Sequence, residues 1–195
     1  MTDTLFILLA AYLLLGYSRA LLHSHWSLLT AREGFFTIYL VLALVLFVIR
    51  DKAVVYSSRI VDYVYTLLGL GAPSLFQLAS PIATLIGVFL EVVGSALVFG
   101  SFLSLNKSFG LGPENRGIKT GGVYRLVRHP MYSGYMVAEL GFLLDNFSLF
   151  NLAVLVISIL FLLLRMRAEE RLLRKDSSYV KYARMVRWRI IPFVF

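Results

Sequence analysis

The sequence is 195 residues long, is 59% apolar and 15% charged, and has a mean hydropathy of +0.79. This composition excludes an ordinary soluble domain and indicates an integral membrane protein. The chain has no cysteine, which excludes disulfides, thiolate metal sites and cysteine nucleophiles. The formal net charge of +8 lies next to apolar segments, so attraction to anionic membrane lipids explains it and we expect no nucleic-acid partner.

Apolar segments along the chain predict five or six membrane-spanning helices. Four approach the ~20 helical residues that cross about 30 Å of hydrocarbon, and two weaker ones are interrupted by glycine, proline or acidic residues. In chain order the six segments are residues 4–22, 34–49, 61–79, 82–103, 132–147 and 149–164. The first has no basic n-region and no clear cleavage site, so we expect it to remain as a helix. The predicted fold is an all-α, polytopic transmembrane helix bundle.

No repeat or low-complexity tract divides the chain, so we expect one membrane domain over residues 1–195. Within it, residues 1–103 hold the N-terminal spans, and residues 104–195 hold a loop, a helical hairpin that turns at Asp145 and Asn146, and a cytosolic amphipathic tail. The loop and the tail carry 14 of the 19 lysines and arginines, which predicts that both face the cytoplasm. Six spans would place the N-terminus inside, and five would place it outside.

The stretch "GVYRLVRHPMYSG" at residues 122–134 is unusually polar for this chain. Pro130 suits the first turn of a helix, where its missing N–H has no cost, so His129 is expected at a helix start. With Arg128 and Tyr132 nearby, the stretch offers a cation, hydrogen-bond donors and free helix N–H groups, which suit a carboxylate or another anion. The alternative is that these residues only anchor the helix at headgroup depth.

A second polar cluster follows the last span, in "RMRAEERLLRKDSSYVKYARMVRWRIIP". Arg165 and Glu169 are at i, i+4 on one helix face, and a later amphipathic segment carries Tyr179 and Tyr182. A basic helix on the membrane surface explains the lysines and arginines. It does not explain the adjacent glutamates or the tyrosine pair.

Together the two stretches resemble the signature of the membrane methyltransferases that include isoprenylcysteine carboxyl methyltransferase and the phospholipid N-methyltransferases. The family pattern is G-P-Y-R-x-x-R-H-P-x-Y, then E-E-x-x-L, two tyrosines and a terminal R-x-x-P. Here "GGVYRLVRHPMYSGY" and "AEERLLRKDSSYVKYARMVRWRIIP" match it over residues 107–192. The chain departs from the pattern at Val123, where the family usually has proline, and at "RKDSSY", where many relatives have a Phe-Gly pair before the tyrosine.

The resemblance implies a methyltransferase that binds S-adenosylmethionine in a cytosol-facing pocket. It assigns cofactor binding to eight residues, the first two of them through their backbone: Tyr124, Leu126, His129, Tyr132, Glu169, Glu170, Tyr179 and Tyr182. It also makes three arginines, Arg128, Arg165 and Arg189, candidates for binding the anionic ends of cofactor or acceptor. Both signs of charge and an aromatic wall suit this cofactor, which carries an ammonium, a carboxylate and a sulfonium. The transfer is an in-line displacement that requires no metal.

The acceptor is expected to be a lipophilic molecule that enters from the bilayer. A nearby arginine favours a carboxylate acceptor of the isoprenylcysteine kind, while the family also methylates phospholipid amines and small thiols. A non-catalytic transporter or assembly protein is the alternative of another class. Its best support is Glu91 and Glu139, each inside a predicted span, because acidic residues at membrane depth are usually functional.

Overall fold

A computed structural model describes residues 41–78 and 84–194, and this part of the chain is mostly helical. The predicted span at residues 4–22 lies outside the described residues, as does the first part of the span at 34–49, of which residues 41–49 are helical. The number of spans, five or six, therefore stays a prediction.

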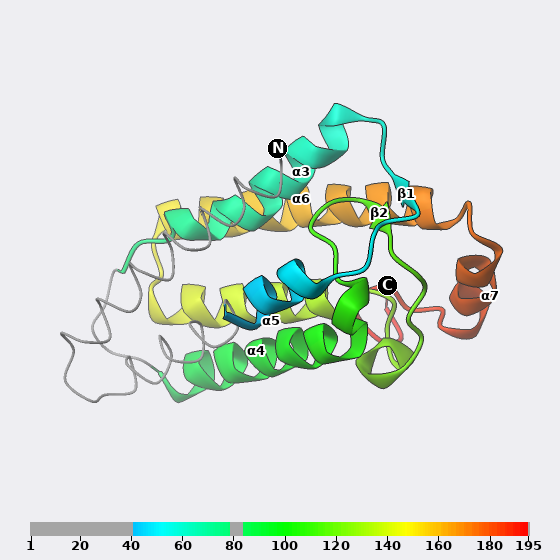
Figure 1. The fold of residues 1–195 in the computed structure, drawn as a ribbon. Helices are drawn as coiled ribbons and strands as arrows, with labels where there is room; N and C mark the ends of the chain where they lie inside the picture. The colour runs from blue at the N-terminus through cyan, green and yellow to red at the C-terminus, as the bar shows by residue number, and fades with distance from the viewer. Residues whose placement is uncertain (1–40, 79–83, 195) are drawn as a thin grey trace.

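Four long helices form two layers (Figure 1). One layer holds α4 (Leu85–Leu105) and α5 (Pro130–Asp145), and the other holds α3 (Ile60–Gly71) and α6 (Leu149–Leu173). The short turn at residues 146–148 joins α5 to α6 as the predicted helical hairpin. These two consecutive helices contact each other less than each contacts its partner within its own layer.

Small residues bring α4 and α5 into close contact. A Cβ on Gly94 would lie 2.5 Å from the backbone oxygen of Gly134, and a Cβ on Gly141 would lie 2.6 Å from the backbone oxygen of Gly87. Larger side chains at these positions would push the two backbones apart. Close approach through small residues is how helices commonly associate in membranes, where burial of apolar surface gives little driving force.

Two of the described helices are long and apolar enough to cross a membrane, the segments Leu85–Ser108 and Leu149–Leu173. The segment Ile60–Leu75, which joins α3 to the 3-10 helix η1 (Ala72–Leu75), is apolar but shorter. In α6 the apolar run ends at Leu164, after 16 residues or about 24 Å. The helix itself continues to Leu173, and its last third carries charged residues.

The loop and the tail meet at one end of the bundle (Figure 1). After α4 come two 3-10 helices, η2 (Asn106–Ser108) and η3 (Gly122–Arg125), with the strand β2 (Glu114–Asn115) between them. The strand β2 pairs antiparallel with β1 (Val55–Tyr56). Beyond α6 lies the short helix α7 (Ser177–Met185), followed by the C-terminal segment. Segments from three distant parts of the chain are thus gathered at the end of α6 that carries its charged residues.

Candidate functional site

The start of α5 is held in place by the C-terminal segment. Pro130 is the first residue of the helix and His129 is its N-cap, as predicted. The backbone N–H groups of Arg128 and His129 donate to the carbonyls of Trp188 and Arg189, at 2.9 and 2.8 Å. These bonds fix the backbone on which the His129 side chain stands.

Arg128 and Glu170 form a buried ion pair, with 2.7 Å between Arg128 Nη2 and Glu170 Oε1. Arg128 Nη1 also donates to the carbonyls of Val186 and Arg187, at 2.9 and 2.8 Å. His129 Nε2 lies 3.4 Å from the same carboxylate oxygen. Arg128 therefore joins Glu170 of α6 to the C-terminal segment, and Glu170 is held by two residues that directly precede α5.

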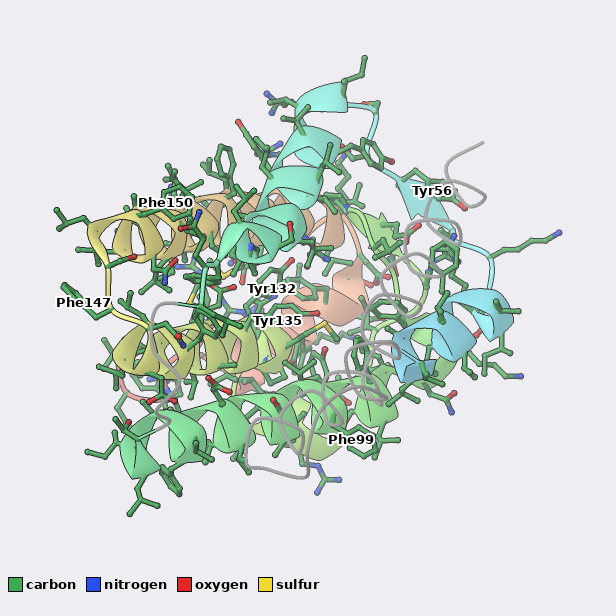
Figure 2. The ribbon with its side chains drawn as sticks, turned by 90° about the vertical axis from the view of Figure 1, so that its left-hand side faces the viewer. Tyr56, Phe99, Tyr132, Tyr135, Phe147 and Phe150 are labelled. Carbon is green, nitrogen blue, oxygen red and sulfur yellow. The ribbon has the colours of Figure 1, made fainter. Side chains whose placement is uncertain are left out.

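Glu169, one residue earlier, faces a second arginine. Tyr132 donates its phenolic hydrogen to Glu169 Oε1 at 2.6 Å, and Arg165 Nε donates to the same oxygen at 3.2 Å, one helical turn away as predicted. The Arg165 guanidinium also lies 5.2 Å from the centre of the Tyr132 ring. Figure 2 shows Tyr132 and Tyr135 in the space between the two helix layers.

Arg165 has N–H groups that no residue of the described structure accepts. Its side chain is only 4% exposed, and within the described structure its Nη1 atom is buried without a hydrogen-bond partner. A buried N–H group without a partner costs about 1–3 kcal/mol. A bound anion would remove this cost, so Arg165 is the strongest candidate in the site for contact with a negatively charged ligand.

Two tyrosines of α7 close one side of the site. Tyr179 donates to Glu170 Oε1 at 3.2 Å, and Tyr182 donates to the Tyr124 carbonyl at 2.7 Å. Burial raises the pKa of both phenols, and for Tyr179 the negative charge of Glu170 adds to this effect. Both tyrosines therefore keep their protons at neutral pH and act as hydrogen-bond donors.

The N-cap of α7 ties this helix to the loop. Asp176 accepts from Ser178 N at 2.8 Å and from Asn115 Nδ2 at 3.0 Å. These bonds, above all the one from Asn115, lower the pKa of Asp176. The loop and α7 thus face each other across the site as one connected rim.

These elements enclose a pocket. Eight of the eleven residues predicted for the site line it: Tyr124, Arg128, His129, Tyr132, Arg165, Glu169, Tyr179 and Tyr182. Glu170 lies directly behind this wall through its bonds to His129 and Tyr179. The Leu126 side chain is 63% exposed and does not line the pocket. Arg189 also lies outside it, where its Nε donates to Glu170 Oε2 at 3.2 Å.

The loop contributes lining residues that the sequence did not single out. Glu114 and Arg116 form an ion pair of 2.8 Å with side chains 7% and 3% exposed, and both line the pocket together with Ile118. The sequence feature that could have indicated them is a pair of opposite charges two residues apart in a glycine-rich loop. Their importance depended on the loop folding back over the helix ends, which no local pattern indicates.

Glu139 and Glu91 both face the bundle interior rather than lipid. Glu139 is 8% exposed and accepts a hydrogen bond from Ser158 of α6 at 2.9 Å. Its Oε2 is buried and finds no partner in the part of the chain that the structure describes. Glu91 is also buried, beside Gly141 of α5. Neither carboxylate is therefore exposed on the outside of the bundle.

Comparison with known families gives one match. The model of the phospholipid methyltransferase family matches residues 82–178, which run from just before α4 to the start of α7. The matched segment contains the loop, the start of α5 and both glutamates of α6, whereas Tyr179, Tyr182 and Arg189 follow it. No curated protein matches the chain. The matched half of the chain thus contains most of the pocket.

Proposed function

Because the chain belongs to the phospholipid methyltransferase family of membrane methyltransferases, we propose that it transfers a methyl group from S-adenosylmethionine to a lipophilic acceptor that carries a carboxylate. The acceptor would be an isoprenylcysteine-like molecule. The pocket would open to the cytoplasm, at the end of a multi-pass bundle where the basic loop and tail gather.

One observation carries the cofactor part of the proposal, the buried guanidinium of Arg165 with its unbonded Nη1 in the wall of the pocket. An arginine binds carboxylates through parallel N–H bonds. Glu169 beside it supplies the opposite charge, at 3.2 Å from Arg165 Nε. A pocket with both signs of charge suits a zwitterionic ligand better than a simple anion.

The residues present fit S-adenosylmethionine. The cofactor's carboxylate suits Arg165, its ammonium suits Glu169, and its sulfonium and adenine suit the rings of Tyr132, Tyr179 and Tyr182. When bound, it supplies an electrophilic methyl group. Glu170 would act indirectly, because its Oε1 holds His129 and Tyr179 in the pocket wall.

Alignment and exclusion of water are then the main tasks of the protein. A carboxylate acceptor is ionised at neutral pH and needs no base to remove a proton. Tyr132 lies in the space between the two helix layers (Figure 2), and both its ring and the Arg165 guanidinium line the pocket. An acceptor that arrives from the bilayer would meet these two side chains first.

A phospholipid amine is the second candidate acceptor. The name of the matched family supports it, as does Glu139, whose Oε2 is buried without a partner among the described residues and could attract a cationic headgroup. The change Glu139→Gln separates a cavity role from a structural one, since it deletes the charge and keeps the shape. Strongly reduced turnover at unchanged thermal stability supports the cavity role, and lost stability with normal turnover per folded molecule rules it out.

The decisive test is calorimetric titration of the detergent-solubilised protein with S-adenosylmethionine and with its demethylated product. We expect affinity in the micromolar range, and a large loss of it in His129→Ala and Arg165→Gln. Arg184→Gln, a change of an exposed residue of α7, is the matched control and should bind normally. No binding by the wild type would contradict the enzyme proposal and favour a transporter or assembly protein.

The acceptor is identified by methyl transfer from labelled cofactor to three probes. These are a farnesylated cysteine derivative, phosphatidylethanolamine and a small alkyl thiol. We expect the carboxylate probe to be methylated fastest. Faster methylation of phosphatidylethanolamine would reassign the acceptor while leaving the cofactor site intact.

A further inference from the structure

A second pocket lies on the outer side of α6, separate from the one that holds the predicted cofactor residues. Its lining is Arg167, Glu170, Arg171, Arg174 and Arg189. Arg167 and Arg171 lie on α6 and Arg174 is its C-cap, and their spacings of four and three residues place their side chains on one helix face. The fourth comes from the C-terminal segment, and the pocket therefore joins two elements.

Glu170 forms the wall between the two pockets. Its Oε1 is bound on the inner side by Arg128, Tyr179 and His129. Its Oε2 accepts on the outer side from Arg174 at 3.3 Å and from Arg189 at 3.2 Å. The charge of Glu170 is thus already balanced by the buried Arg128, at 2.7 Å.

Positive charge remains in excess around the outer pocket. Arg171 lies 3.5 Å from Asp62 of α3, while Arg167 is exposed and has no ion-pair partner within residues 41–78 and 84–194. The Arg171 and Arg174 side chains are 48% and 50% exposed. Arg167 can therefore turn toward a ligand without breaking an ion pair, and the half-exposed Arg171 and Arg174 can share their remaining N–H groups with it.

The depth of the pocket indicates what kind of anion it meets. The apolar run of α6 ends at Leu164. At 1.5 Å per residue, Arg167 lies about 4.5 Å and Arg174 about 15 Å beyond that point along the helix. The polar headgroup layer on each side of a bilayer extends over about 5–8 Å. Arg167 therefore lies inside this layer, whereas Arg171 and Arg174 lie beyond it, from where their long side chains can reach back toward lipid phosphates.

We propose that this arginine cluster is a binding site for the phosphate group of an anionic phospholipid, distinct from the methyl-transfer pocket. Guanidinium forks bind phosphate oxygens through paired hydrogen bonds, which suits Arg167, Arg171 and Arg174. The excess of positive charge disfavours headgroups that carry an ammonium. A lipid with a phosphate and no cation, such as phosphatidic acid, is therefore the preferred ligand over phosphatidylcholine.

The test measures binding of short-chain phosphatidic acid to the detergent-solubilised full chain by thermophoresis. Each arginine near a membrane surface contributes about fivefold to the affinity for anionic lipid. We expect Arg167→Gln combined with Arg171→Gln to weaken binding about 25-fold by this measure. Arg167→Gln alone keeps the contact of Arg171 with Asp62 and should weaken it about fivefold.

Lys181→Gln combined with Arg184→Gln on α7 is the matched control, with the same loss of charge at exposed positions. This control should change the affinity less than about twofold. Titration with S-adenosylmethionine reports separately on the inner pocket, so failure of one site does not imply failure of the other. Equal affinity in the cluster variants and the wild type would overturn the proposal. Displacement of the lipid by inorganic phosphate at equal concentration would overturn the assignment to a lipid headgroup.

Discussion

The two ends of the α5–α6 hairpin both bury polar side chains, but they use them differently. At the turn, Asn151 bonds the backbone of Gln77 in both directions, at 3.0 and 2.8 Å, and also bonds the Asn146 carbonyl. Asp145 accepts from the backbone and hydroxyl of Thr84 at the start of α4, at 2.8 and 2.6 Å. These contacts satisfy chain ends and turns, as buried polar groups generally do.

At the opposite end the polar groups bond mainly to one another. Glu169 and Glu170 bind arginine, tyrosine and histidine side chains around a pocket. In the described structure the turn has a buried atom without a partner, Asp145 Oδ2, and the pocket end has two, Arg165 Nη1 and Arg116 Nε. The Asp145 carboxylate packs on Gly87, where an added Cβ would lie 2.1 Å from it, whereas Arg165 lines a pocket. Buried polarity therefore marks a ligand site only where space adjoins it.

The largest expected effect is at the pocket end. Arg165→Gln removes the charge and the free donor, and loss of one preorganised donor to a charged group typically lowers turnover about 10²–10³-fold. We expect kcat/KM per folded molecule to fall by this factor, with a lower thermal midpoint as well because the buried pair with Glu169 is broken, whereas Arg184→Gln should keep both. Wild-type turnover in this variant would contradict the assignment of a ligand-binding role to the pocket end of the hairpin.

The next largest effect is at the turn. Asn151→Ala leaves the Gln77 backbone without its partners, and each buried group left unsatisfied costs about 1–3 kcal/mol. We expect the free energy of unfolding to fall by about 2–3 kcal/mol, measured by denaturant titration in mixed micelles, with normal turnover per folded molecule. Leu149→Ala, at an exposed neighbouring position, is the control. Lost turnover at unchanged stability would mean that the turn has a functional role.

A smaller effect is expected from Tyr182→Phe. The change keeps the ring and removes the hydrogen bond to the Tyr124 carbonyl, which should weaken binding of S-adenosylmethionine about fivefold. Burial raises the pKa of Tyr182, so the folded protein favours the neutral phenol, and the bond persists at every pH below about 10. The ratio of wild-type to variant affinity should therefore stay constant from about pH 6 to about pH 9. A ratio that falls within this range would contradict the assigned protonation state.

The smallest effect concerns accessibility, not energy. Single cysteines at Lys119 and Lys181 should react with a membrane-impermeant maleimide from the same side, because loop and α7 share one end of the bundle (Figure 1). A cysteine at Leu149, at the turn, should react from the other side. The chain has no native cysteine, so labelling has no background. Opposite accessibility of Lys119 and Lys181 would contradict the hairpin topology and the shared pocket.

Local sequence patterns were sufficient to predict several helices and one side-chain contact of this protein. Membrane helices follow from apolar segments of sufficient length, the start of α5 follows from Pro130, and the contact between Arg165 and Glu169 follows from helical spacing. Each depends on residues within a few positions of one another, where backbone geometry alone sets the distance. The family signature rests on the same kind of local order.

Tertiary structure alone decided which of these residues work together. The partners of Glu170 include Arg128, 42 residues away, and Arg189, 19 residues away, and Asn151 reaches Gln77 across 74 residues. The tertiary structure also places the ion pair of Glu114 and Arg116 in the pocket wall and leaves the Leu126 side chain exposed. Such contacts depend on how helices pack and loops fold back, and the free energies that choose among those arrangements are summed over the whole bundle rather than recorded in any short stretch of sequence.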